Sequence, residues 1–459
     1  MKTLSEYIAP LLAQLGQKQV RENTENLSNK IIDNQTGQLW SLSDDKNEYN
    51  RNLRLLNGSL QTIVDVSKLN ISLLANSVDF LQDKVYLIVL HDGSDIRKPW
   101  SKESENLDIV RDLQGKLIHG YPTFNSIAID LKGKQVRLLQ STPYSTKEKT
   151  YLSQTDINDY HTNKLLKARR NEVKHLLATG DWYNHNSIVN THVDRINAQI
   201  REVNPKAIVI HVYDRGHDSV ALFQHHDKLD SFFMVRLKLN RNSNELIINE
   251  KGKEVAVKLS KQQFLEGHEK HYEKLRFKNK TYFRVKGIFE WSKLKLEGKF
   301  YSVVKVRFYT SEGKSIFGQP MLLLTNIDVY NEALTELVFE IYMKRVKIEG
   351  VFKFCKQELG WENFRIKDFE GIKNLIGLVY FIAGYFYEVE HELVKHPAAQ
   401  WLAQLGGGKG KVTPFYILKG IGKLAQFLNI QQMFQQIPES KNLAQQAIDT
   451  FFSTNTKVE

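Results

Sequence analysis

The stretch "KVYLIVLHDGSDI", residues 84–96, is a continuous apolar run that ends in acidic residues, the first of them Asp92. Such a run is typical of a central strand that is buried on both faces of a sheet. The stretch "AIVIHVYDRGHDS", residues 207–219, has the same pattern and reaches its first acid at Asp214. We therefore expect two neighbouring central strands, each ending at a carboxylate.

The segments around these two strands predict an α/β fold. Their alternation of apolar and polar residues changes between period two, which indicates strands, and helical spacing. In chain order we expect an antiparallel hairpin (124–131 and 135–142, joined by Lys132-Gly133-Lys134), two helical stretches (about 158–178 and 189–203) and a further strand (231–241).

Changes in pattern along the chain divide it into five predicted parts. The first part is helical apart from a loop-like stretch at 28–52, and the third consists of short alternating runs separated by turns. The parts are a helical N-terminal domain (1–80), the first part of an α/β core (81–243), a β-rich basic insertion (244–325), a helical completion of the core (326–390) and a helical C-terminal region (391–459).

The charge of the chain is positive and unevenly distributed. Of 459 residues, 41% are hydrophobic and 25% charged, with a formal net charge of +12. Residues 251–310 contain 16 Lys and Arg against 6 Asp and Glu. A local field of this size favours a polyanionic partner, most simply nucleic acid. A solubilising surface explains the same charge equally well.

The sequence carries no pattern of a secreted or membrane protein. Cys355 is the single cysteine, so no intrachain disulfide can form and a reducing compartment is expected. The N-terminal residues lack the charged lead and apolar run of a signal peptide, and the most apolar segment, 376–387, is too short to span a bilayer. We expect a soluble cytoplasmic protein, associated with the nucleoid.

The stretch "IYMKRVKIEGVFKFCK", residues 341–356, contains the most specific pattern. Tyr342, Arg345, Glu349 and Lys356 would lie within an arc of roughly 60° on a single α-helix. A lone acid beside two cations and a phenol suits metal-bound phosphate, although a solvated polar face has the same composition. Glu349 would then face Asp92 and Asp214. Three such carboxylates can share two divalent metals in an in-line phosphoryl displacement, and Mg²⁺ prefers oxygen ligands of this kind.

The order Asp, Asp, insertion, Y-x2-R-x3-E-x6-K resembles the bacterial insertion-sequence transposases of the DDE class, and more narrowly their "insertion sequence four" group. The pieces that carry the resemblance are "HDGSD" (91–95), "YDRGHDS" (213–219) and the four positions of 341–356, and it covers residues 84 to about 360. It implies an RNase H-like core in which Asp92, Asp214 and Glu349 hold two Mg²⁺ ions, with Mn²⁺ as a substitute. By the same resemblance, Tyr342, Arg345 and Lys356 contact phosphates of the transposon end, and Arg215 contacts DNA or an acid.

The basic insertion interleaves aromatic residues with its cations, and such residues can stack on unpaired bases. Packing on the inner face of a small sheet accounts for most of them. Some relatives of the family hold a flipped base on an aromatic residue just before an "LLLT"-like strand. Here that strand is "MLLLT" (321–325), preceded by Gln319 and Pro320, so Trp291 or Phe317 would have to substitute.

These observations lead to one principal hypothesis. The chain is expected to be a Mg²⁺-dependent DDE transposase that binds terminal inverted repeats as a homodimer, cleaves the DNA strands and joins the freed ends to target DNA. Two alternatives remain open: a DNA-binding regulator without catalysis, and an RNase H-like nuclease that does not join strands.

Overall fold

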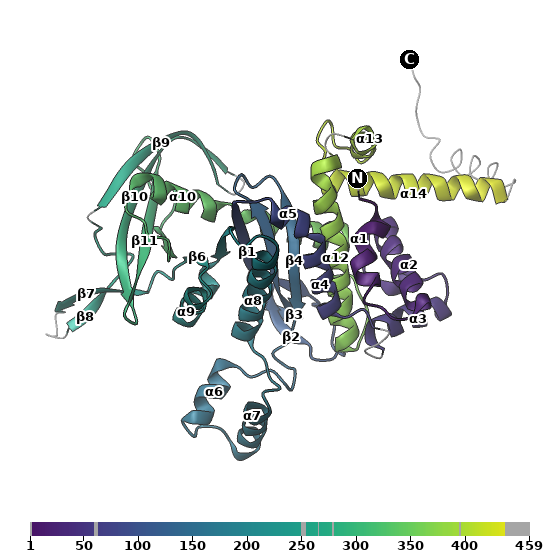
Figure 1. Cartoon of the computed structure of the whole chain (residues 1–459), viewed down its shortest axis with the longest axis horizontal. Helices are drawn as coiled ribbons and strands as arrows, with labels where there is room; N and C mark the ends of the chain where they lie inside the picture. The colour runs from purple at the N-terminus through teal and green to yellow at the C-terminus, as the bar shows by residue number, and fades with distance from the viewer. Residues whose placement is uncertain are drawn as a thin grey trace.

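The chain folds around one large mixed β-sheet covered by helices (Figure 1). The computed structural model describes residues 2–58, 63–248, 254–264, 266–277, 280–393 and 396–436. The ten-stranded sheet has the order β2-β3-β1-β5-β6-β12-β11-β10-β9, with β4 also paired to β3. This architecture confirms the prediction of an α/β fold.

The core half of the sheet contains the two predicted acidic strands as neighbours. It comprises β1 (Tyr86–Arg97), β2 (Asp108–Arg111), β3 (Leu117–Asp130), β4 (Val136–Pro143), β5 (Ile208–Tyr213) and β6 (Phe232–Arg236). Strand β1 pairs with β5 in parallel and with β3 antiparallel, and β5 pairs with β6 in parallel. The predicted hairpin is present as β3 and β4.

Both faces of β1 and β5 are buried, which explains why their sequences are continuously apolar. Side chains alternate between the faces of a strand, so Ile88, Leu90, Ile210 and Val212 share one apolar cluster, while Leu87, Val89 and Val209 belong to another on the opposite face. Because β1 and β5 pair at Leu90 and Val212, the same alternation directs Asp92 and Asp214 to the first face.

The prediction that the first strand ends at Asp92 is wrong. Strand β1 continues to Arg97 because its antiparallel partner β3 extends alongside it as far as Gly120. What ends before Asp92 is the parallel pairing with β5, whose last pair joins Leu90 to Val212. The two aspartates therefore lie where the gap between β1 and β5 opens.

The basic insertion continues the sheet beyond β6. It contains β9 (Glu266–Phe277), β10 (Lys280–Leu296), β11 (Lys299–Tyr309) and β12 (Met321–Thr325), all antiparallel, and β12 pairs with β6. Strands β7 (Asn242–Ile248) and β8 (Glu254–Lys258) form a separate two-stranded sheet. Figure 1 shows the long strands of the insertion at the opposite end of the molecule from the N-terminal helices.

The N-terminal helices pack against a long, late helix. They are α1 (Leu4–Leu12), α2 (Lys18–Asn34), α3 (Lys46–Asn57), α4 (Val66–Asn76) and α5 (Val78–Gln82), and the late helix is α12 (Phe369–Leu393). The prediction of a loop over 28–52 is wrong, because α2 extends to Asn34 and α3 begins at Lys46. Most of their few apolar residues, such as Ile31 and Leu55, are buried in the shared core, and Leu53 packs against it while partly buried. Tertiary packing therefore stabilises two helices whose sequences are mostly polar.

The motif 341–356 does not form one continuous helix, which corrects the prediction of a single stripe. Helix α10 (Glu332–Met343) ends before Arg345, and α11 (Val346–Glu358) begins after it. Helix α10 packs against β10 and β11 of the insertion, and α11 packs against β1 and α12. The chain passes from one part of the sheet to the other at this junction, where Lys344 and Arg345 donate to the carbonyls three residues before them.

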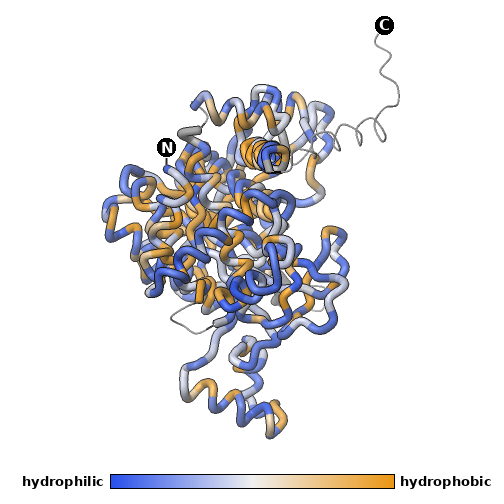
Figure 2. The backbone as a smooth tube through the Cα atoms, turned by 90° about the vertical axis from the view of Figure 1, so that its right-hand side faces the viewer, coloured by the Kyte–Doolittle hydropathy of each residue, from blue (hydrophilic) through white to orange (hydrophobic). Residues whose placement is uncertain are grey.

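The remaining helices cover the second face of the core or extend from it. Helices α8 (His185–Val203) and α9 (Val220–Lys228) follow α6 (Gln154–His161) and α7 (Lys167–Thr179), which project from the body in Figure 1. Helices α13 (Pro397–Leu405) and α14 (Pro414–Gln436) confirm a helical C-terminal region as far as residue 436, and the rest of that prediction lies outside the described residues. Apolar residues concentrate inside the body (Figure 2). Within the described ranges, no helix is long and apolar enough to cross a membrane.

Candidate active site

Asp92 is a carboxylate almost completely enclosed by the sheet and by α11. Its side chain retains 15% of its exposure. Burial raises its pKa to about 6, because an ionised carboxylate loses hydration there. The positive charge of Arg345 opposes this rise, whereas the negative charges of Asp214 and Glu349 add to it. The mutual effect shows that the three predicted carboxylates are close enough to interact.

Arg345 lies between two of these carboxylates. Its guanidinium donates one hydrogen bond to Asp92 Oδ2 and another, at 2.6 Å, to Glu349 Oε1. The junction between α10 and α11 positions Arg345 for this contact, while Glu349 lies in the first turn of α11. A planar guanidinium with several donors can bridge two acids in this way, whereas an ammonium group would act as a point charge.

Asp214 follows the last residue of β5 and is fixed by its own turn. Its Oδ1 accepts a hydrogen bond from the backbone of Gly216 at 2.8 Å and lies 2.8 Å from Nδ1 of His217. Burial alone would raise the pKa of Asp214, but the contacts with His217 and Gly216 outweigh it and lower the pKa. The ring of His217 also packs near the rings of Phe124 and Tyr213, with centroids 5.5 Å and 5.4 Å away. Its buried Nε2 has no hydrogen-bond partner among the residues that the structure describes.

A network of buried histidines supports the two strands from the opposite face of the sheet. His91 Nε2 lies 2.8 Å from His211 Nδ1, and His91 Nδ1 lies 2.7 Å from the hydroxyl of Ser126. His192 of α8 contacts the same hydroxyl at 2.8 Å. Burial lowers the pKa of His192 and His211 to about 3, so both rings are neutral at physiological pH. These hydrogen bonds fix the positions of β1, β3 and β5 next to Asp92.

Tyr342 is buried beside Arg345 at the end of α10. Burial raises the pKa of its phenol, and the neighbouring charges of Arg345 and Arg236 oppose that rise. Its hydroxyl is within hydrogen-bonding reach of Arg345, and the negative charge of Asp214 adds to the rise of its pKa. Arg236, the last residue of β6, is therefore a further cation near the site. No local sequence pattern points to Arg236, since its place near the site depends on the sheet order that brings β6 beside β5.

Lys356 lies away from the three carboxylates. Its ammonium donates to the backbone oxygen of Asp95 at 2.6 Å and lies 3.5 Å from Oε1 of Glu362. Only 18% of its side chain is exposed, and burial lowers its pKa. The structure therefore brings together Asp92, Asp214, Tyr342, Arg345 and Glu349. Lys356 lies about two helical turns beyond Glu349 on α11.

The two other predicted DNA contacts occupy different environments. Arg215 begins the short helical turn after Asp214 and is partly exposed near the site. Trp291 is partly buried on β10, where its ring lies 6.2 Å from that of His268. That face of the insertion packs against α10, since Phe289 contacts Phe339. Trp291 is thus placed among packing residues.

The donor atoms of the site fit a divalent cation such as Mg²⁺, because three carboxylates supply hard oxygen ligands. The arrangement is not preassembled for one, however. In the part of the chain that the structure describes, no three acidic, histidine or cysteine side chains are close enough to hold a metal ion. Arg345 provides the positive charge between Asp92 and Glu349. A metal would be held by Asp92, Asp214 and Glu349 after Arg345 has moved away.

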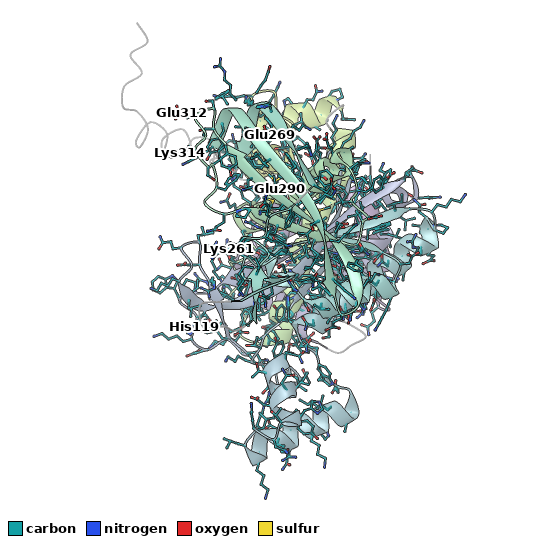
Figure 3. The ribbon with its side chains drawn as sticks, turned by 90° about the vertical axis from the view of Figure 1, so that its left-hand side faces the viewer. His119, Lys261, Glu269, Glu290, Glu312 and Lys314 are labelled. Carbon is teal, nitrogen blue, oxygen red and sulfur yellow. The ribbon has the colours of Figure 1, made fainter. Side chains whose placement is uncertain are left out.

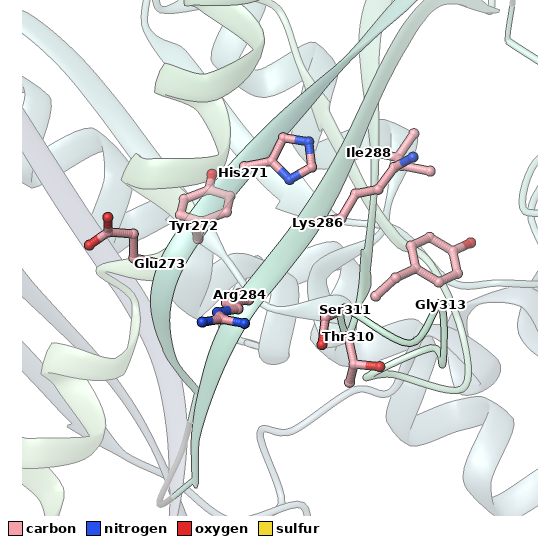
Figure 4. Close-up of a pocket in the computed structure, with 10 residues that line it drawn as sticks. His271, Tyr272, Glu273, Arg284, Lys286, Ile288, Thr310, Ser311 and Gly313 are labelled. Atoms are coloured by element: carbon pink, nitrogen blue, oxygen red, sulfur yellow. The ribbon is translucent and has the colours of Figure 1, made fainter.

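A cavity outside this centre lies on the insertion. It has a volume of about 670 Å³ and is lined by His271, Arg284, Lys286 and Tyr309, among others (Figure 4). Acidic side chains offset part of the positive charge here: Glu269 and Glu290, labelled in Figure 3, pair with Lys286 at 2.6 Å and Arg307 at 2.7 Å. The insertion therefore exposes less free charge than its composition suggests.

Part of the chain matches a known protein family. Residues 189–384 match the family model described as a transposase DDE domain. The matched range includes Asp214 and Glu349, and Asp92 precedes it. The match supports a DDE transposase family and, with it, a metal-dependent enzyme that cleaves and joins DNA. No curated protein matches the chain.

Proposed function

We propose that the chain is a DDE transposase of the "insertion sequence four" group that cleaves and joins DNA at the ends of its own element. Its catalytic residues would be Asp92, Asp214 and Glu349, with Mg²⁺ as the metal. The observation that carries this proposal is the contact of one guanidinium, that of Arg345, with Asp92 and Glu349, which are far apart in the sequence.

The topology of the sheet supports the same proposal. Strand β1 lies between an antiparallel neighbour, β3, and a parallel neighbour, β5. We assign β1 and β3 to β6 to an RNase H-like core, interrupted by the insertion and completed by α11. This assignment places the first aspartate on the central strand, the second after its parallel neighbour, and the glutamate on a helix that covers both.

The residues of the site have complementary roles in this proposal. Bound divalent ions supply Lewis acidity and neutralise the charge that develops on the transferred phosphoryl group. The pKa of Asp214, which is lowered through His217 and Gly216, keeps that carboxylate ionised. Arg345 forms ion pairs with Asp92 and Glu349 in the free protein. In the complex with DNA, its guanidinium would instead donate hydrogen bonds to a phosphate. Its planar group can contact a phosphate through two parallel hydrogen bonds.

The proposed partners follow from the same reaction. The helical region 1–80, the basic insertion and Arg215 would bind duplex DNA at terminal inverted repeats. The region 391–459 would bind DNA or join two copies in a homodimer that holds both ends. Such a protein would act in the cytoplasm, on the nucleoid.

Substitution of Glu349 tests the proposal directly. Inverted repeats that bracket the gene, themselves bounded by short direct repeats, would identify the DNA substrate. With that DNA and Mg²⁺, Glu349→Gln should abolish strand cleavage while retaining DNA binding. The matched control is Glu340→Gln, because Glu340 is an exposed acid on the preceding helix. Cleavage by Glu349→Gln at a near-normal rate would refute the proposed mechanism.

Product analysis separates the proposal from its two alternatives. A transposase yields covalent junctions between donor and target DNA, whereas an RNase H-like nuclease yields cut ends alone. A regulator without catalysis would bind the terminal repeats in the absence of metal and cleave none of them.

A further inference from the structure

A second hollow lies beyond the carboxylates, at the far ends of β1 and α11. Its volume is about 650 Å³. Its walls are residues 97–104, which start at the last residue of β1, and residues 362–367, which follow α11. Trp100 lines the hollow, and 92% of the residue is exposed to solvent. Large aromatic side chains usually bury most of their surface, so an indole this exposed is available to a ligand.

The floor of the hollow is rigid. Arg97 binds Glu362 through two guanidinium hydrogen bonds, at 2.9 Å and 2.8 Å, and through its backbone N–H at 3.0 Å. The ammonium of Lys98 donates to the carbonyl oxygens of Glu362 and Phe364 and lies 3.9 Å from the centroid of the Phe364 ring. These contacts fasten the end of β1 to the segment after α11, so the two walls keep a fixed separation.

The charge of the hollow is positive. Five cations line it, Arg97, Lys98, Lys102, Arg365 and Lys367, against the carboxylates Glu103 and Glu362. The two acids are held by cations of the same hollow, Glu362 by Arg97 and Glu103 by Lys367 at 2.6 Å. Lys102 and Arg365 are exposed on the rim near Trp100. A cationic rim beside a free indole is complementary to a strand of nucleic acid, whose phosphates and bases alternate.

The hollow lies at the end of the strand that carries Asp92. Arg97 follows Asp92 on the same strand by five residues, a distance of about 17 Å at the usual rise of a β-strand. Lys356 connects the two places, because its ammonium contacts the backbone of Asp95 and lies 3.5 Å from Glu362. A DNA strand positioned at the carboxylates would reach the hollow within a few nucleotides.

We propose that this hollow binds single-stranded DNA that continues from the candidate active site, with phosphates on Lys102 and Arg365 and an unpaired base stacked on Trp100. This inference rests on the proposed function, because it assumes that the carboxylates act on DNA. A base inside a duplex has both faces covered by its neighbours, so Trp100 selects a strand that is unpaired at this point.

The experiment compares two variants with two matched controls. Trp100→Ala and Arg365→Ala alter the hollow, while Tyr330→Ala and Arg170→Ala alter an exposed aromatic ring and an exposed cation outside the hollow and outside the regions proposed to bind DNA. Binding is measured by fluorescence anisotropy with a labelled 30-nucleotide strand and with the duplex of the same sequence, over a range of salt concentrations. Thermal melting verifies that each variant is folded.

Trp100→Ala should weaken binding of the single strand about tenfold and binding of the duplex less than twofold. Arg365→Ala should weaken binding of the single strand and reduce the slope of log affinity against log salt by about 0.7, the effect of one phosphate contact. Trp100→Phe should restore most of the lost affinity. Unchanged binding of the single strand by Trp100→Ala, or an equal loss in Tyr330→Ala, would overturn the inference.

Cleavage assays distinguish this result from a failure of the proposed function. If the wild-type protein cleaves and joins DNA while Trp100→Ala binds single strands normally, the inference is wrong and the proposed function stands. If the wild-type protein neither cleaves nor joins DNA but the binding differences are present, the hollow binds single strands and the proposed function is wrong.

Discussion

Lowering the pH from 8 to 5 should weaken the binding of divalent metal about tenfold, because Asp92 must be ionised to act as a ligand. Its pKa is raised from 3.8 to about 6, chiefly by burial. The ionised fraction is then about 99% at pH 8, half at pH 6 and about 9% at pH 5. An aspartate with an ordinary pKa would lose less than about 10% of its charge over the same range.

Isothermal titration calorimetry with Mn²⁺ at a series of pH values measures this effect, and DNA cleavage at limiting metal concentration gives a second readout. Saturating metal should restore cleavage at pH 5.5. Metal affinity that is constant between pH 8 and pH 5 would refute the reasoning that a buried Asp92 is a ligand.

The same pKa predicts an opposite effect on stability. A carboxylate whose pKa is raised in the folded state favours folding below about pH 4, and this contribution is lost as the pH rises through about 6. In metal-free protein at pH 7.5, Asp92→Asn should therefore increase the free energy of unfolding by at most about 3 kcal/mol, which corresponds to the shift of the pKa from 3.8 to about 6. Urea denaturation should show this gain at pH 7.5 and its disappearance near pH 4.

Three further substitutions test the site and its scaffold. Arg345→Lys should lower the cleavage rate roughly 10- to 100-fold at unchanged stability, since a point charge cannot bridge Asp92 and Glu349 or grip a phosphate through a fork; a wild-type rate would contradict this. His217→Ala should weaken metal binding or activity about 10- to 100-fold, because Asp214 loses the partner that orients it; calorimetry that finds no change would remove His217 from the site. Gly120→Ala should destabilise the fold by about 1–3 kcal/mol or more, since the added Cβ would lie 2.3 Å from Ile96 O and 2.5 Å from Val110 Cγ2. The control in urea denaturation is Gly318→Ala, because a Cβ added there would have no described residue within 4 Å apart from its chain neighbours.

The sequence predicted the central strands and the convergence of their aspartates because the relevant signal is local. A continuous apolar run can be recognised without knowledge of its partners, and the alternation of side chains relates Asp92 to Leu90 and Asp214 to Val212. The two apolar runs therefore indicated both where the strands lie and which face of the sheet Asp92 and Asp214 share.

Features that depend on packing between distant segments could not be predicted in this way. The end of α10 and the start of α11 follow from the two surfaces that these helices cover, so the helical spacing of Tyr342 and Glu349 was misleading. The burial of Lys356 depends on Glu362, which follows α11, and on the extension of β1 along β3. Nothing in the local sequence around Lys356 distinguishes a buried ion pair from an exposed DNA contact.

The central claim is that Asp92, Asp214 and Glu349 form one metal centre from which Arg345 is displaced. Crystals of the protein grown with Mn²⁺ and a DNA end would locate the metal by its anomalous scattering. Our account predicts two peaks, about 3.5–4 Å apart, among the three carboxylates, with Arg345 on a DNA phosphate. Mn²⁺ peaks elsewhere, with Arg345 still joining Asp92 to Glu349, would contradict it.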